Sequence, residues 1–445
     1  MVSEEKGASV GYVRLLSRNA NFRNLWFGQL ISSAGDWFNT VALLGLVLEL
    51  TGNGLSAGLV LIASSLPMFL LTPIAGPVVD RFDRRKVMLV SNLLGALFAF
   101  SFLLIRDSTT VWIAYAGTAL LVSTASFFGP AAGALTPTIV SREELFSANA
   151  LSSSTWGIMV MVGSGLGGIM SAWLGRDLVF VFNAISFLLS NLLIWFVIPP
   201  VKINQPQSEP RSKSSTWDDF MIGITYLKQH PPVAALVAVK SGWGLAGGVL
   251  VLLAVFGNQV FKAGDAGIGL LYAARGCGAL IGPIVLRPLV GNDATRMWRV
   301  IVASFVISGV GYLLFGLSEA SGLWLAALAL IVAHFGGGAN WVIPTILLQD
   351  IVPNRILGRI LSFDIGLVTL TTAISTLFYS LALQSGVSPV WMAYLGSGIF
   401  LTCALVWGIV TIRPALKINN ESIRKIRESQ LKTQERPLEG EVYLK

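Results

Sequence analysis

The feature that most constrains this chain is a series of twelve apolar stretches, each long enough to cross a lipid bilayer as a helix. A helix needs about 20 apolar residues to span the hydrocarbon core. In order, the stretches are Leu25–Leu50, Leu55–Val79, Val87–Ile105, Val111–Pro137, Ala148–Leu174, Val179–Ile198, Val233–Val260, Gly267–Leu289, Val300–Leu317, Leu323–Leu348, Ile360–Gln384 and Val390–Ile412. The sequence therefore predicts an all-α integral membrane protein with twelve transmembrane helices.

The composition excludes a soluble enzyme, because only 12% of the residues are charged and 54% are hydrophobic. Cys277 and Cys403 lie inside apolar runs, so we expect neither a disulfide framework nor a cysteine metal site. With two histidines there is no H-E-x-x-H zinc motif. The segment 163–168 matches G-x-G-x-x-G, but it lies inside a span and indicates close helix packing rather than nucleotide binding. We expect no enzyme activity, cofactor or metal.

The distribution of Lys and Arg predicts the orientation. With both termini placed in the cytoplasm, 26 basic residues fall in cytoplasmic segments and 3 in outer loops, namely Arg106, Arg176 and Lys262. This asymmetry follows the positive-inside rule. It also explains most of the net charge of +8, which therefore does not indicate nucleic-acid binding. We expect a multi-pass protein of the plasma membrane (a bacterial inner membrane), in contact with lipid and monomeric.

The two halves of the chain resemble each other. A shift of 206 residues places Gly76-Pro-Val-Val-Asp-Arg on Gly282-Pro-Ile-Val-Leu-Arg and Trp37 on Trp243, and a shift of 207 places Pro137-Thr-Ile on Pro344-Thr-Ile. Parallel repeats of this kind leave a cavity between two halves. We predict pseudo-symmetric six-helix halves at 22–198 and 231–412, a cytoplasmic N-terminal tail at 1–21, a cytoplasmic linker at 199–230 and a charged cytoplasmic tail at 413–445.

Within the linker, residues 216–229 have apolar side chains at helical spacing. They are Trp217, Phe220, Met221, Ile224 and Leu227. Two interpretations are open: an interfacial helix that joins the halves, or an ordinary loop helix.

The most specific motif is the loop between spans two and three, Gly76-Pro-Val-Val-Asp-Arg-Phe-Asp-Arg-Arg-Lys86. A basic loop alone would explain Arg81, Arg84 and Arg85, but not Gly76 and Asp80 at their spacing. The loop resembles the signature of the major facilitator superfamily, and the resemblance covers about residues 20–415. The segments Gly35-Asp-Trp-Phe, Glu49-Leu-Thr-Gly and Val352-Pro-Asn-Arg-Ile-Leu-Gly-Arg359 are similar to a branch of macrolide-efflux and enterobactin-exporter-like permeases.

The resemblance implies a conformational latch that closes the cytoplasmic side. Asp80 would engage the cytoplasmic end of span eleven, and Arg84 or Arg85 would pair with a nearby carboxylate. Asp350 and Asp364 are the acids available there. In the second copy Leu286 replaces Asp80, so only the first half is expected to carry a complete latch.

Four ionisable residues fall within spans: Asp36, Lys240, Arg275 and His334. Such residues face a cavity or a partner because they are costly in lipid. In the superfamily spans one, four, seven and ten line the cavity. Asp36 has three open interpretations: a proton-coupling or substrate site, a structural ion pair with Lys240 or Arg275, or exposure to an outer vestibule. His334 is either a proton relay or substrate ligand, or a hydrogen-bonded interior residue.

Aromatic and amide side chains are predicted near the same places. They are Trp37, Phe38, Asn39, Phe127, Phe128, Trp156, Trp243, Asn340 and Trp341. Rings beside a carboxylate suit a large amphipathic or cationic substrate. The alternative for each ring is packing against lipid.

The sequence and the resemblance together predict a secondary active transporter that works by alternating access. It would export a hydrophobic or amphipathic small molecule, such as a drug or siderophore, in exchange for protons. The direction rests on the branch resemblance, and the glycine-rich fifth span lacks the Gly-Pro pair of proton-coupled antiporters. One alternative is a lipid or lysophospholipid flippase on the same fold. Another is a non-transporting membrane sensor or scaffold.

Overall fold

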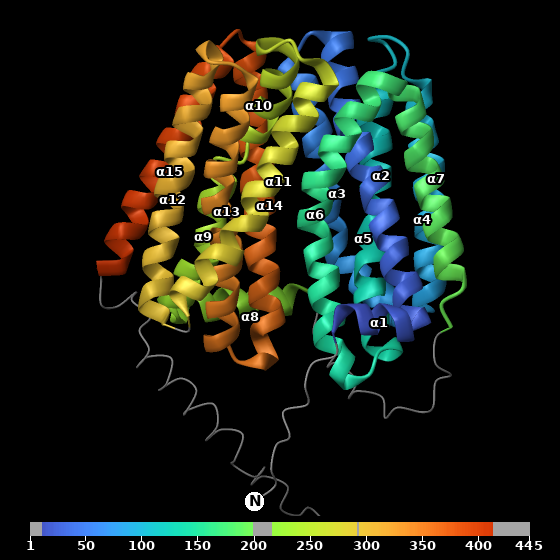
Figure 1. Ribbon diagram of the computed structural model, residues 1–445. Coiled ribbons are helices and arrows are strands. Elements are labelled where there is room, and N and C mark those ends of the chain that lie inside the picture. Colours follow the sequence, from blue (N-terminus) through green and yellow to red (C-terminus); the bar gives the residue numbers. More distant parts are fainter. Residues whose placement is uncertain (1–10, 199–215, 292, 413–445) are drawn as a thin grey trace, which may run out of the picture.

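The chain is a bundle of long, nearly parallel helices (Figure 1). The structure, a computed structural model, describes residues 11–198, 216–291 and 293–412. In these residues twelve helices are long and apolar enough to cross a membrane. Their ends agree with the predicted spans to within a few residues, which confirms the fold class. Residues 1–10 of the predicted N-terminal tail, 199–215 of the linker and the whole tail 413–445 lie outside the described residues.

The first half contains the first six spans. Its helices are α1 (Tyr12–Arg18), α2 (Ala20–Thr51), α3 (Gly54–Arg81), α4 (Arg84–Ser101), the short 3₁₀ helix η1 (Phe102–Leu104), α5 (Trp112–Ile139), α6 (Arg142–Leu174) and α7 (Arg176–Trp195). Helix α2 packs against α6 and α7, whereas α5 packs against α3 and α4. The ends of the helices carry their own caps: Asn53 begins α3, Asp83 begins α4, and Ser141 with Glu144 forms a capping box on α6.

The second half contains the other six spans, preceded by the linker helix. Its helices are α8 (Thr216–Gln229), α9 (Pro231–Leu245), α10 (Val249–Val255), the π-helical turn η2 (Phe256–Val260), α11 (Gly264–Val290), α12 (Ala294–Leu317), η3 (Ser318–Ala320), α13 (Leu323–Ile351), α14 (Asn354–Gln384) and α15 (Pro389–Ile412). Helix α8 has the bounds predicted for the amphipathic helix and packs against α9 and α14.

The seventh span is interrupted, although its sequence predicts a continuous helix. The chain turns between α9 and α10, at residues 246–248. The Ser375 hydroxyl of α14 accepts a hydrogen bond from the Gly248 N–H (3.0 Å) and donates one to the Leu245 carbonyl (2.7 Å). Backbone groups freed inside a membrane need such partners. One serine therefore satisfies both sides of the break.

The two halves touch mainly through α6 with α11 and α3 with α14. Glycines allow these contacts to be close. A Cβ on Gly168 would lie 2.6 Å from the Asp265 carbonyl oxygen and 2.8 Å from the Gly269 Cα, and a Cβ on Gly58 would overlap the Ser380 hydroxyl. Membrane helices associate through small residues in this way. These contacts lie toward the end of the bundle opposite α1 and α8, which we call the far end (Figure 1).

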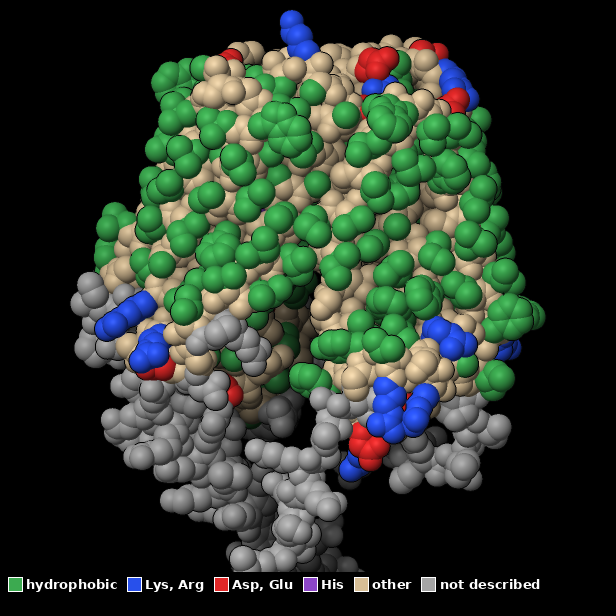
Figure 2. Space-filling view, in the orientation of Figure 1, with side chains coloured by type: hydrophobic (Ala, Val, Ile, Leu, Met, Phe, Trp, Pro, Cys, Tyr) green, Lys and Arg blue, Asp and Glu red, His purple; other side chains and the backbone are tan. Residues whose placement is uncertain are grey.

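Toward the other end, which carries α1 and α8, the halves separate. Figure 2 shows a hollow between them that opens at this α1/α8 end. At the far end the surface is continuous across the two halves in the same view. The structure is therefore closed at the far end and open at the α1/α8 end.

We predict that Gly168→Val weakens the contact between the halves. The added side chain would collide with backbone atoms of α11, and overpacking of this kind costs about 1–3 kcal/mol. The thermal midpoint of the purified protein in detergent should fall. Gly133→Val is the matched control, because a Cβ on Gly133 meets nothing within 4 Å. Equal midpoints for the two variants would contradict the role assigned to this contact.

Candidate functional site

Asp36 lies in the middle of α2, and its neighbours hold this helix in place. A Cβ on Gly35 would come within 2.2 Å of the Ser186 hydroxyl of α7, so α2 packs tightly on α7 there. The next residue, Trp37, packs on Gly163 of α6. Asp36 is half-buried, and its Oδ1 atom is buried without a hydrogen bond from the described residues. The structure therefore holds an unpaired carboxylate oxygen inside the bundle.

Trp37 connects this region to the second half. Its ring centroid is 6.4 Å from that of Tyr272 on α11, and the Arg275 guanidinium lies 5.9 Å from the same tyrosine ring. Trp37, Tyr272 and Arg275 therefore form a row that crosses the boundary between the halves. The predicted residues Asp36, Trp37 and Arg275 are all half-buried.

A second aromatic cluster surrounds His334 of α13. The Tyr312 hydroxyl and the His334 Nε2 atom are 2.9 Å apart, and the rings of Trp243 and His334 are 5.2 Å apart. His334 is only 3% exposed. Of the two interpretations of His334, this geometry favours the hydrogen-bonded interior residue over a side chain on the wall of an open cavity. The buried Trp243 Nε1 atom has no hydrogen-bond partner in the described part of the chain.

Lys240 of α9 has its own counter-ion within the second half. Its ammonium group pairs with Asp364 of α14, donates to the Thr345 hydroxyl (2.8 Å) and lies 5.2 Å from the Trp341 ring centroid. Both charged side chains are at most 3% exposed. Lys240 does not pair with Asp36, and Asp364 is not free to serve the latch in this conformation. The structure places this pair inside the half rather than on the cavity wall.

The other predicted site residues range from buried to about half exposed. Asn39 and Asn340 are buried, and neither side-chain nitrogen nor oxygen of Asn340 has a partner among the described residues. Trp156 and Trp341 are about half exposed, whereas Phe38, Phe127 and Phe128 are half-buried. The predicted set is therefore not one continuous surface.

The loop between α3 and α4 lies at the α1/α8 end and does not engage the second half among the described residues. Asp80 and Arg81 are exposed, and Asp80 has no hydrogen bond or ion pair within the described part of the chain. Arg84 donates to the Ala134 carbonyl (2.7 Å) and Arg85 to the Ile194 carbonyl (3.2 Å), instead of to carboxylates. A Cβ on Gly76 would meet nothing within 4 Å, so no close helix contact needs this glycine here.

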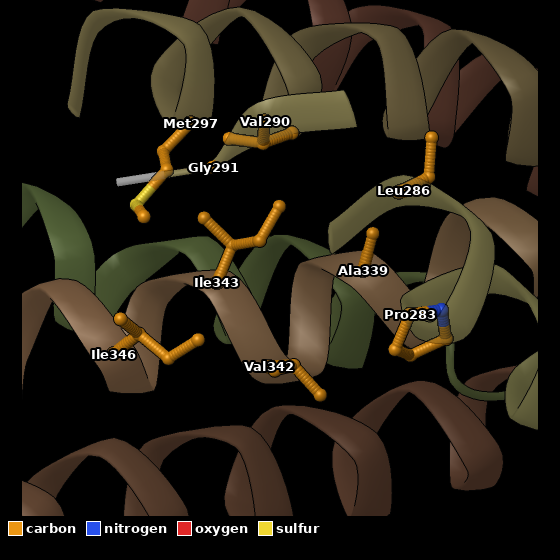
Figure 3. A pocket seen from close by; sticks show the side chains of 9 residues that line it. All are labelled: Pro283, Leu286, Val290, Gly291, Met297, Ala339, Val342, Ile343 and Ile346. Carbon is orange, nitrogen blue, oxygen red and sulfur yellow. The ribbon is translucent and has the colours of Figure 1, made fainter. Parts of the chain in front are cut away.

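These placements do not test the latch, because the resemblance assigns it to a conformation in which the end carrying this loop is closed, whereas this end is open here. Asp350, the other predicted acid, lies near the end of α13 on the open side. In the second copy, Leu286 lines a small apolar pocket of about 40 Å³ between α11, α12 and α13. Figure 3 shows Ile343 pointing into it toward Val290 and Met297. At the position that corresponds to Asp80 of the first half, the second half therefore has an apolar side chain in apolar surroundings.

The far end carries an ion-pair cluster that the sequence analysis did not find. Arg176 of α7 pairs with Asp265 of α11 (2.8 Å) and with Glu49 of α2 (2.6 Å), and Asp265 also accepts a hydrogen bond from Ser171 of α6. We call these four residues the far-end clamp. It joins the two halves. The signal was weak, because Asp265 and Glu49 lie at span ends, where charged residues are common.

Comparison with known proteins identifies the family. A family model described as transmembrane secretion effector matches residues 16–445. The chain belongs to this family, which is part of the major facilitator superfamily. Macrolide efflux protein A of Streptococcus pyogenes is 23% identical over 395 residues, 86% of this chain and 94% of that protein. The transporter YfiS of Bacillus subtilis is 28% identical over 218 residues, and the match spans about half of each protein.

Solved structures support the fold. A bacterial homologue of the iron transporter ferroportin, in an inward-facing state, superposes with a TM-score of 0.66 at 17% identity, covering 87% of this chain and 98% of that one. The chain is a multi-pass membrane protein of the superfamily, as its twelve apolar helices and the family model show. Its fold and family are those of transporters, and relatives include efflux proteins.

We predict that Asp265→Asn loosens the far end, because it removes the negative charge that binds Arg176 from the other half. The opening is measured with the variant Ser380→Cys, in a protein whose own Cys277 and Cys403 have been replaced. Ser380 is fully buried where α14 meets α3. Labelling of the introduced cysteine by a membrane-impermeant maleimide should become faster.

The matched control is Asp177→Asn. It breaks an exposed ion pair with Arg106 (2.7 Å) at the same end but within one half. Labelling in this control should stay as in the parent protein. Equal acceleration in both variants would show that general loosening, not the clamp, is responsible.

We predict that Lys240→Met strongly destabilises the second half, since it leaves the Asp364 carboxylate buried without a cation. Breaking a buried pair on one side costs about 3–5 kcal/mol. The double variant Lys240→Met/Asp364→Leu should recover most of the thermal midpoint, because apolar residues replace both charges. A double variant as unstable as the single one would show that the pair is not the source of the effect.

Proposed function

We propose that the chain is a proton-coupled exporter of a hydrophobic or amphipathic small molecule and that Asp36 is its proton site. The observation that carries the proposal is the unpaired Asp36 carboxylate in the middle of α2, beside the row of side chains that crosses between the halves. A carboxylate in a membrane span that lacks a cation is costly and marks function.

The α1/α8 end is assigned to the cytoplasm. Of the basic residues at the far end, Arg106 and Arg176 are paired with acids, whereas the loop after α3 carries Arg81 and Lys86 exposed. Figure 2 shows the larger groups of Lys and Arg at the α1/α8 end. With this orientation the hollow opens to the cytoplasm, and the present conformation is inward-facing. Substrate would enter from the cytoplasm or the inner leaflet.

Proton exchange suits Asp36 because no salt bridge fixes its charge. Lys240, a candidate partner, is held by Asp364, and Arg275 makes no ion pair with Asp36. A free carboxyl can therefore gain and lose a proton as the cavity changes sides. The similarity to macrolide efflux protein A supports export as the direction, and the fold supports alternating access.

The test is proton movement in energised inside-out vesicles, followed with a pH-sensitive dye. Macrolides, lipophilic cations, catecholate siderophores and lysolipids are added one at a time to vesicles with wild type or Asp36→Asn. We expect at least one compound to trigger proton release from wild-type vesicles. The amide cannot carry a proton, so the variant should give no release.

Asp107→Asn is the control, because Asp107 is an acid in an exposed loop outside the spans. It should behave as wild type. Substrate movement with an unchanged proton signal in Asp36→Asn would refute the assignment of Asp36. Movement of lysolipids alone, without protons, would favour the flippase alternative.

A further inference from the structure

We propose that Arg275 forms an oxyanion-binding subsite at the boundary of the two halves, so that the transported molecule is an amphipathic carboxylate, sulfonate or phosphate. The proposal rests on the transporter function proposed above and specifies its substrate class. It differs from the expectation of a cationic substrate, which the rings beside Asp36 suggested.

The position of Arg275 on α11 directs it to the interior. Gly269 and Gly276 face α6, and Gly278 and Gly282 face α13, where added Cβ atoms would collide with backbone. At 100° per residue, Arg275 lies between these two contact faces and opposite Ile284, which is 64% exposed on the outer surface. The guanidinium therefore lies on the face of α11 directed toward the centre of the bundle.

The guanidinium has no anionic partner. Among the described residues it makes no salt bridge and no hydrogen bond, although it carries five N–H donors. The charge inside a span is costly unless a partner or a cavity compensates for it. Lys240, by contrast, has Asp364 and Thr345. Of these two cations inside spans of the second half, Lys240 is paired, whereas Arg275 has no hydrogen-bond or ion-pair partner among the described residues.

The tyrosine hydroxyls near Arg275 are already hydrogen-bonded. The Tyr272 hydroxyl donates to the Leu250 carbonyl (3.1 Å), and the Tyr312 hydroxyl is bonded to His334 (2.9 Å). Arg275 pairs with no carboxylate among the described residues. Among the described residues of this cluster, the guanidinium is therefore the charged donor group that a ligand could use.

The same place offers an apolar surface. Tyr272 lies beneath the guanidinium and faces Trp37 of the other half. A planar fork of donors binds a carboxylate, sulfonate or phosphate with two parallel hydrogen bonds, and the two rings suit the hydrophobic body of the same molecule. Because the rings come from different halves, a bound ligand would contact both halves at once.

The experiment uses the full-length protein in nanodiscs of phosphatidylcholine and a matched pair of probes. 1-Anilinonaphthalene-8-sulfonate and N-phenyl-1-naphthylamine share their ring system, but only the first carries an anionic group. Binding is measured by energy transfer from tryptophan to the naphthalene, with empty nanodiscs subtracted. Arg275→Gln should bind the sulfonate about ten- to a hundredfold more weakly, as expected for a lost charged hydrogen bond. Binding of the neutral amine should not change.

Competition distinguishes the oxyanions. Dodecanoate and dodecyl phosphate are added to the sulfonate complex, with dodecanol as the neutral control. Displacement by either anion and not by dodecanol is the expected result, and the stronger competitor names the headgroup. Arg296→Gln, an exposed arginine of α12 away from this row, should bind both probes as wild type does.

The proposal fails if Arg275→Gln binds the sulfonate as tightly as wild type, or if both probes weaken equally. It also fails if chloride alone displaces the sulfonate at concentrations where dodecanoate does not. The measurement is made at equilibrium without a proton gradient. Loss of proton coupling in the vesicle experiment would therefore leave this result standing, and failure here would leave proton-coupled export intact.

Discussion

The close contact of α6 with α11 is the constraint on which the rest of the structure depends. Lipid tails are as apolar as leucine, so membrane helices gain little from burying apolar side chains against each other. Association between the halves must come from backbone-level packing and polar links. Gly168 and Gly269 supply the first, and Arg176 with Asp265 supplies the second. Both are concentrated toward one end, and the hollow at the other end is the geometrical result.

The charges within the spans fall into two groups, and their partners separate them. Lys240 and Asp364 satisfy each other within one half, so the pair can remain intact while the halves move. Asp36 and Arg275 lie near the boundary, on α2 and α11, without partners among the described residues. The fixed pair stabilises the second half, whereas the two charges without partners are the ones that we propose bind a proton and a ligand. This contrast could not be read from hydropathy, which treats all four residues alike.

The sequence predicted the spans well because length and apolar content decide whether a segment crosses a membrane. It also located the loop after α3 and the helix 216–229. Side-chain pairing was less predictable. The pairing of Asp36 with Lys240 was one of several possibilities, and the structure pairs Lys240 with Asp364, 124 residues away. Such contacts depend on helix rotation and on which helices are neighbours.

Two features had little signal in the sequence. The far-end clamp joins residues at the ends of four spans, where charged and polar residues are common. The break after Leu245 was hidden because the glycines around it are frequent throughout the chain. The break is recognised in the structure by the Ser375 hydroxyl of α14, which binds the backbone on both sides of it.

That hydroxyl has a mechanical consequence. Ser375 belongs to α14, the helix that contacts α3 of the other half through Ser380 and Gly366. The same helix holds Asp364, the counter-ion of Lys240. A sliding movement of α14 would therefore change the seventh span, because α14 binds both the break at residues 246–248 and the Lys240 ammonium group. We therefore expect the interrupted span and α14 to move together, so that a displacement at the boundary of the halves would reach the core of the second half.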